Sequence, residues 1–160
     1  LVAGQYPYNL IERGLEVEVL PMAAALGLGI VTYRPLAVGV LTAKYLDGVR
    51  EGSRGVSDDR PTAWTEKYGE GIRKLRDFAQ ERGYTAADAA IAWVYSQRAV
   101  TAALVGVSRI DQLEANLKAA GWDMTAEERD QISSFFPTEV WEEAGGRFPE
   151  WRRSYEIAPV

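Results

Sequence analysis

Two stretches of this 160-residue chain combine an apolar run with a loop that could bind an anion. Residues 33–45 join small side chains to Lys44, and residues 105–116 place Ser108 and Arg109 directly before a helical pattern. Loops of small residues and helix N-termini expose backbone N–H groups, and the helix dipole adds positive potential there. The types and spacing of these residues therefore predict recognition of an anionic, phosphate-bearing ligand.

Both loops follow predicted strands. Short apolar runs at residues 1–6, 28–33 and 101–107 are typical of buried parallel strands. Helical patterns separate and follow them, and the expected helices lie within residues 13–26, 64–82, 86–97, 109–120 and 126–136. Because the carboxyl ends of parallel strands meet at one edge of a sheet, we expect the two loops to form one surface.

Local signals mark several helix ends and the apolar core. Thr85 and Thr125 each stand three residues before an acidic residue, which predicts capping boxes. Ser108 is expected to cap the helix that follows it, and Gly27 and Gly83 are expected to end helices. The residues expected on the buried faces of the helices at 64–82 and 86–97 are Ile72, Leu75, Phe78, Ala79, Ala89, Ala90, Trp93 and Val94.

The alternation of strands and helices predicts an α/β fold, namely part of a (β/α)8 TIM barrel with three parallel strands. A whole barrel needs about 250 residues, more than this chain has. We assign residues 1–137 to the barrel portion and residues 138–160 to a C-terminal tail that packs on it. The chain opens in a strand-like run without an initiator Met, so we expect a fragment. A missing N-terminal half or self-association would then cover its open sheet edges.

The composition argues against several classes of function. The chain has no cysteine and no histidine, which removes disulfides, thiolate metal sites and Ser-His triads. Its net charge of −5 argues against a nucleic-acid-binding surface. No apolar run approaches the roughly 20 residues of a membrane span, and no signal peptide is visible. We therefore expect a cytoplasmic protein without membrane contact.

Residues 5–13 carry the pattern Gln-x-x-Tyr-Asn followed by Arg, which resembles the sixth-strand motif of the aldo-keto reductases. The resemblance covers nearly all of residues 1–120 and implies that the chain supplies strands six to eight, the NADP-binding half of that barrel. It implies that Gln5 bonds the nicotinamide carboxamide, for which an amide offers both a donor and an acceptor. It also implies that Tyr33 stacks on the nicotinamide ring.

The same resemblance assigns the phosphate contacts of the cofactor. The loop after the second strand would wrap the pyrophosphate, through Arg34, Pro35, Leu36, Ala37 and Val38. Lys44 would lie on the cofactor side, and Arg54 would belong to a long loop, residues 46–63, that folds over the bound cofactor.

The adenine end of the cofactor would meet the junction after the third strand. Gly106, Ser108 and Arg109 would bind the adenosine 2′-phosphate, which makes the cofactor NADP rather than NAD. Gln112 and Asn116, on one face of the helix, would contact the adenine end. The family often has Glu directly before this Asn, where this chain has Ala, so one adenine contact is expected to be lost.

The family reduces aldehydes and ketones with NADPH through an Asp, Tyr, Lys and His tetrad that lies before the sixth strand. No residue of this chain matches the tetrad, and the chain has no histidine, so we assign it no catalytic residue and no metal site. A complete form would reduce a small carbonyl substrate with NADPH. The alternatives are a non-catalytic NADP-binding module, a half-barrel that assembles with itself or another chain, and a proteolytic fragment without activity.

Overall fold

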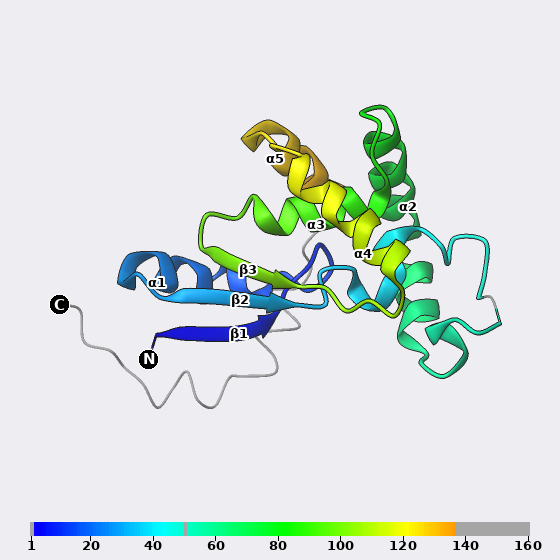
Figure 1. Cartoon of the computed structure of the whole chain (residues 1–160), viewed down its shortest axis with the longest axis horizontal. Coiled ribbons are helices and arrows are strands. Elements are labelled where there is room, and N and C mark those ends of the chain that lie inside the picture. Colours follow the sequence, from blue (N-terminus) through cyan, green and yellow to red (C-terminus); the bar gives the residue numbers. More distant parts are fainter. Residues whose placement is uncertain (1, 50, 137–160) are drawn as a thin grey trace.

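The computed structural model describes residues 2–49 and 51–136. Residues 138–160, assigned above to a tail, lie outside the described residues. Strands and α-helices alternate along the chain (Figure 1). Their bounds are β1 Ala3–Pro7, α1 Val19–Leu26, β2 Gly29–Tyr33, α2 Arg60–Gln80, α3 Ala86–Tyr95, β3 Val100–Leu104, α4 Ile110–Leu117 and α5 Ala126–Ser134. Short 3-10 segments connect them: η1 Gly14–Glu16, η2 Ala37–Thr42, η3 Arg54–Val56 and η4 Lys118–Gly121.

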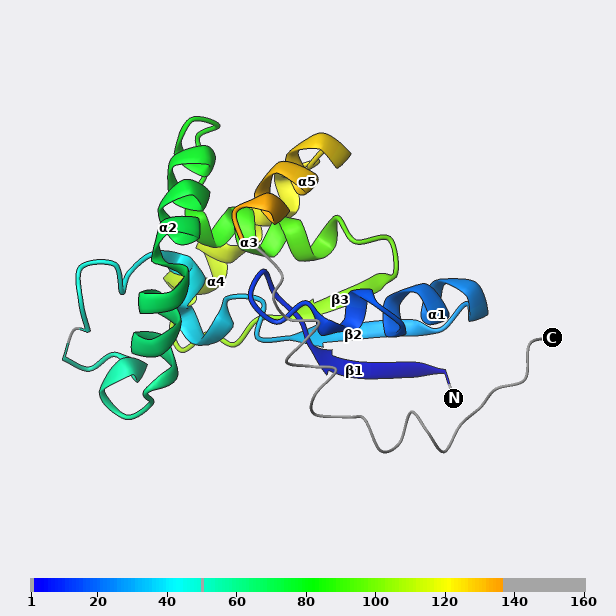
Figure 2. The ribbon, with the colours of Figure 1, turned by 180° about the vertical axis from the view of Figure 1, so that it is seen from behind.

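The three strands form one parallel sheet in the order β1-β2-β3, which confirms the predicted α/β class. α1 packs against β2 and α3 against β3 (Figures 1 and 2). The register shifts by one residue between Ile30 and Val31 where β2 meets β3. At that point Thr101 keeps the ladder bonded, because its hydroxyl accepts a hydrogen bond from the Ile30 N–H at 3.2 Å.

The two faces of the sheet differ in burial. Ile30 and Thr32 of β2 are buried on the face that the helices cover. Val31 and Tyr33 point to the opposite face, because successive strand residues alternate, and both are only half-buried. Leu104, paired with Tyr33, is 48% exposed. Among the described residues, the second face is therefore the open one.

The apolar core lies between the helices and the covered face of the sheet. All eight residues predicted on the buried faces of the two long helices are buried. The capping boxes at Thr85 and Thr125 are both formed, and Gly27 and Gly83 adopt the left-handed backbone expected after a helix end. These local predictions are confirmed because their hydrogen bonds involve only neighbouring residues.

Some predicted boundaries are wrong. α2 begins at Arg60, four residues before the predicted start, because Pro61 sits in its first turn, where no backbone N–H is needed. β3 is Val100–Leu104 rather than residues 101–107, since pairing with β2 ends where β2 itself ends, at Tyr33. The long loop of residues 46–63 is therefore shorter than predicted.

A buried cluster joins the loop after β1 to α3 and α5. The Tyr8 ring stacks on Trp93 at 5.2 Å, and its hydroxyl donates a hydrogen bond to Glu16 at 2.7 Å. Burial, reinforced by Glu16, raises the pKa of Tyr8 far above its usual range. Arg13 pairs with Glu16 at 2.8 Å and lies over the Trp93 ring. The Trp93 indole N–H donates to the Ser133 hydroxyl at 2.9 Å, so α5 is tied to the same cluster.

In contrast, α4 presents apolar side chains to solvent. Ile110, Leu113 and Leu117 are 76%, 48% and 62% exposed, and no residue of α4 is buried. Their spacing of three and four residues places them on one side of the helix. Within the described part of the chain, this stripe has no apolar partner surface.

Two glycines of α2 give a matched test of core packing. A Cβ at Gly71 would collide with the carbonyl oxygen of Phe135, whereas a Cβ at Gly69 meets only Arg73 at 3.6 Å and Leu46 at 4.0 Å. We expect Gly71→Ala to lower the free energy of unfolding by about 1–3 kcal/mol, because backbone must move. Gly69→Ala should raise it by up to about 1 kcal/mol through helix propensity.

Urea unfolding followed by tryptophan fluorescence measures both variants of the complete protein. Equal effects of the two substitutions would show that the Phe135 carbonyl, just after α5, does not lie against Gly71 as described.

Candidate functional site

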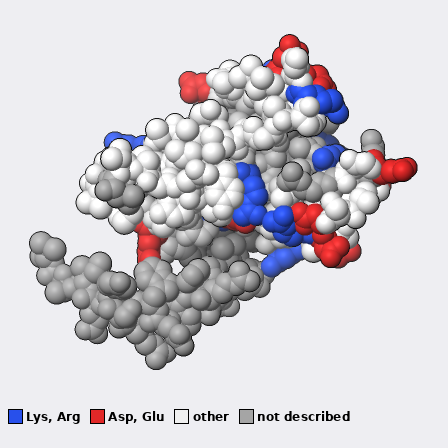
Figure 3. Space-filling model, turned by 60° about the horizontal axis from the view of Figure 1, so that its bottom comes forward, with Lys and Arg blue, Asp and Glu red and all other residues white. Residues whose placement is uncertain are grey.

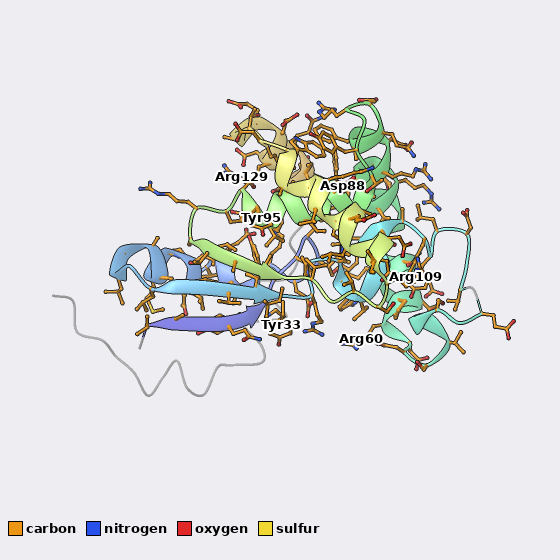
Figure 4. All side chains as sticks on the ribbon, viewed as in Figure 1. Tyr33, Arg60, Asp88, Tyr95, Arg109 and Arg129 are labelled. Atoms are coloured by element: carbon orange, nitrogen blue, oxygen red, sulfur yellow. The ribbon has the colours of Figure 1, made fainter. Side chains whose placement is uncertain are left out.

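The carboxyl edge of the sheet collects the loops that the sequence singled out. β2 ends at Tyr33, which pairs with Pro7 of β1 and Leu104 of β3, so all three loops leave the same edge. Figure 4 shows Tyr33 at the arrowhead end of the sheet and Arg109 beyond the same end. The structure thus brings together the two loops that were predicted to share one surface.

Gln5 and Tyr33 project from the same open face of the sheet. Gln5 pairs with Val31, and Tyr33 follows Val31 by two residues. Because side chains two residues apart in a strand share a face, all three lie on the same side of the sheet. Gln5 is exposed and Tyr33 is half-buried. An amide and an aromatic ring therefore stand on adjacent strands with room for a ligand beside them.

The loop after β1 is organised by Asn9, a fully buried polar residue. Its amide oxygen accepts hydrogen bonds from the backbone N–H groups of Ile11 and Glu12, both at 2.9 Å. Its amide nitrogen donates to the Glu12 carboxylate at 2.8 Å and to the Arg34 carbonyl at 3.0 Å. One side chain thus joins the loop after β1 to the loop after β2.

Arg34 follows Tyr33 directly and has an uncommon backbone. Its φ of 59° lies in the left-handed region, which is costly for a residue with a Cβ. Its guanidinium lies over the Tyr33 ring, 5.2 Å from the centroid, and pairs with Glu12 at 3.1 Å. Its Nε is buried and has no hydrogen-bond partner. Contacts with Glu12 and Tyr33 therefore fix the positive charge of Arg34 at the base of the site.

The rest of this loop turns tightly through η2. Ala37, Val38 and Ala43 have φ values of 48°, 52° and 65°, and Gly39 has 95°. A Cβ at Gly39 would lie 3.0 Å from Cε of Lys44, so the glycine allows a close approach of that side chain. Repeated left-handed residues turn successive backbone groups inward, as in the concavities that hold anions.

The side chains of the same loop divide between core and surface. Pro35, Ala37 and Val38 are buried and Leu36 is half-buried, so this part of the loop offers little accessible surface to a ligand. Lys44 is exposed, with its ammonium 4.9 Å from the Tyr45 ring centroid. The Arg54 side chain lies outside the described part of the chain.

The junction after β3 differs from its prediction. Ser108 does not cap α4; the N-cap position is Arg109, without a side-chain cap bond. Instead, the Gln112 side-chain oxygen accepts hydrogen bonds from the Ser108 N–H at 3.0 Å and hydroxyl at 3.2 Å. The longer glutamine reaches back over the first turn, so the Ser108 hydroxyl donates to it instead of accepting from an N–H of α4. Gly106 and Ser108 are exposed, and Asn116 is half-buried one turn beyond Gln112.

Three arginines around this edge, Arg34, Arg60 and Arg109, are each paired with an acid. Arg109 holds Asp111 with two hydrogen bonds of 2.9 Å, which raise the pKa of Arg109 and lower that of Asp111. Arg60 likewise pairs with Asp58 at 2.7 Å. Figure 3 shows basic side chains gathered on one face with acidic ones beside them. An anionic ligand would therefore have to compete with carboxylates for these guanidinium groups.

Other classes of site find no support in the described residues. No group of three or more His, Cys, Asp or Glu side chains there could hold a metal ion. Among the same residues, no helix is both long and apolar enough to cross a lipid bilayer. The carboxyl edge of the sheet is thus the site that the structure offers.

Comparison with known proteins agrees with this geometry. Residues 1–136 match the model of the aldo/keto reductase family, so the chain belongs to that family. It is 34% identical over 150 residues to an uncharacterised oxidoreductase of Bacillus subtilis, covering 94% of this chain and 43% of that protein. It is 37% identical over 126 residues to an L-glyceraldehyde 3-phosphate reductase of Escherichia coli O157:H7, covering 74% of this chain and 36% of that protein.

A third relative is described as a putative voltage-gated potassium channel subunit beta of Schizosaccharomyces pombe. It is 32% identical over 151 residues, which cover 87% of this chain and 44% of that protein. The chain thus spans less than half the length of the relatives it matches. Its three parallel strands and their helices are consistent with part of the family's TIM barrel.

Sequence reasoning missed the roles of Asn9 and Glu12. Both stood inside the motif at residues 5–13, but no function was given to either. An Asn directly after a strand, whose side chain can bond the backbone two or three residues on, is the signal that could have identified the turn. The bond to the Arg34 carbonyl spans 25 residues, and no local pattern predicts it.

We expect Asn9→Ala to lower the free energy of unfolding by about 1–3 kcal/mol, because it leaves buried backbone groups without partners. Asn116→Ala, at a half-buried helical position, is the matched control and should stay within about 0.5 kcal/mol. Chemical denaturation of the complete protein measures both. Similar losses in the two variants would contradict the role given to Asn9.

Proposed function

We propose that this chain is the cofactor-binding portion of an NADP-dependent reductase that acts on aldehydes or ketones. The observation that carries the proposal is the placement of Gln5 and Tyr33 on one open face at the carboxyl edge of the sheet. Family membership supports it, since curated relatives are oxidoreductases. The cytoplasmic location stays a prediction.

The residues present fit a nicotinamide dinucleotide. When bound, the cofactor supplies a hydride from its nicotinamide ring. Gln5 would accept from and donate to the carboxamide, and Tyr33 would present a ring face for stacking. Arg34 and Lys44 would be the cations near the pyrophosphate. The N–H groups of Ala37, Gly39 and Leu41 already donate to carbonyls of the same loop.

Arg109 is the residue proposed to favour NADP over NAD. It stands at the start of α4, where the helix dipole favours an anion, and its planar guanidinium can bind a phosphate with two hydrogen bonds. In the structure those donors face Asp111. A 2′-phosphate carries more charge than a carboxylate and would draw the guanidinium to itself. Asp111 therefore lowers the affinity that Arg109 could otherwise give.

Reduction of a carbonyl would also need a proton donor, and no residue of this chain matches the family's donor. We assign the donor to the part of the barrel that lies in the unmatched portion of these relatives. This chain then contributes binding and orientation, which hold the ring for hydride transfer, rather than proton transfer.

A second candidate is a half-barrel module that functions by assembly. The exposed stripe of Ile110, Leu113 and Leu117 on α4 and the two sheet edges favour it, because such surfaces are normally covered. The two candidates are compatible, since a covered sheet could still bind cofactor at its carboxyl edge.

For the first candidate, we expect Arg109→Ala in the complete protein to weaken NADP binding about tenfold while changing NAD binding little. The expected loss is that of one charge-assisted contact to the phosphate that NAD lacks. Arg98→Ala is the matched control, because Arg98 lies just before β3, at the opposite end of the strand. Fluorescence titration gives the affinities of the unaltered protein and both variants for each cofactor, and equal losses for both cofactors in Arg109→Ala would count against the assignment.

For the second candidate, we expect the 160-residue chain to self-associate when studied alone, as measured by light scattering. Ile110→Glu with Leu117→Glu should reduce association, because charges replace the apolar stripe. Val56→Glu, at a residue that is equally exposed but far from α4 in sequence, is the control. A compact monomer that unfolds cooperatively would show that the described helices close the sheet by themselves.

A further inference from the structure

We propose that Arg34 and Glu12 form a charge pair behind Tyr33 whose balance keeps the site from favouring either the reduced or the oxidised cofactor. The inference rests on the proposed function, because it requires a nicotinamide ring against Tyr33. It goes further by giving the two charges a role in redox-state selectivity rather than in binding alone.

The position of the pair is fixed by the structure. The Arg34 guanidinium lies over the Tyr33 ring, 5.2 Å from its centroid, so a ligand that stacks on Tyr33 would have to use the opposite face. Its NH2 lies 3.1 Å from the Glu12 carboxylate, and the two side chains are only 29% and 27% exposed. The pair is therefore partly shielded from water, and its field is screened less than that of a surface pair.

Neither charge is free to swing away. Asn9 donates one hydrogen bond to the Glu12 carboxylate at 2.8 Å and another to the Arg34 carbonyl at 3.0 Å. The same amide thus fixes the acid by its side chain and the arginine by its backbone. The left-handed φ of 59° at Arg34 turns the side chain back over the ring that precedes it.

The two redox states of the cofactor differ in charge at the ring. Loss of a hydride from the reduced nicotinamide leaves a ring with one positive charge. A cation behind Tyr33 therefore disfavours the oxidised form, and an anion there favours it. At roughly 9 Å and an effective dielectric constant of about 20, one uncompensated charge changes the ratio of the two affinities on the order of tenfold. Paired, Arg34 and Glu12 largely cancel.

Removing either charge should leave the other uncompensated. The two single variants should therefore shift the ratio of the two affinities in opposite directions. Arg34→Gln leaves Glu12 uncompensated and should shift the ratio of the dissociation constants about tenfold toward tighter binding of the oxidised cofactor. Glu12→Gln leaves Arg34 uncompensated and should shift it in the reverse direction. The double variant should return close to the original ratio. A merely structural role would weaken both forms together and leave the ratio unchanged.

The test measures the affinities of NADPH and NADP⁺ for the complete protein and the three variants by tryptophan fluorescence quenching. Arg82→Gln and Glu128→Gln, which break a similarly shielded pair between the end of α2 and the first turn of α5, are the matched controls and should not change the ratio. Opposite shifts in the two single variants support the proposal.

Shifts of the same sign, or ratios that do not move while both cofactors still bind, overturn this inference and leave the proposed function standing. Absence of binding of either cofactor by the unaltered complete protein overturns the proposed function and the inference with it.

Discussion

The hydrogen bonds of one buried side chain, Asn9, hold the site in its shape. Left-handed backbone at a residue with a Cβ costs about 1–3 kcal/mol, and Arg34 persists in it because its carbonyl is bound from the loop after β1. If the Asn9 amide N–H left this carbonyl, that N–H would be buried without a hydrogen-bond partner. The loops after β1 and β2 are therefore coupled, and a change in either moves the charge that lies over Tyr33.

The sheet supplies the second constraint, which is register. Gln5 and Tyr33 share a face only because Gln5 pairs with Val31, and a slip of one residue would turn Gln5 to the helix-covered side. Packing of Tyr6 against the core opposes such a slip, since the exposed Gln5 would take its side of the sheet. The helices thus fix the site from behind the sheet without contacting it.

The sequence predicted what depends on neighbouring residues and failed where distant contacts decide. The capping boxes at Thr85 and Thr125 and the buried helix faces follow from spacing alone, and they were confirmed. The cap expected from Ser108 was wrong because Gln112 competes for the same turn. The clamp by Asn9 could not be predicted, because its partner lies on another strand's loop. The cofactor contacts of the named side chains stay predictions, and so does the tail of residues 138–160.

The surface that would close the open face of the sheet would also complete the site. The open face that carries Gln5 and Tyr33 also carries Leu104, an apolar side chain 48% exposed beside the aromatic ring. A segment that covers Leu104 and the edge of β3 would also lie next to Tyr33 and form one side of the site. Excluding water there would strengthen every charge effect at the ring, because the effective dielectric constant falls. The balance between Arg34 and Glu12 should therefore matter most in an assembled barrel that closes over this face.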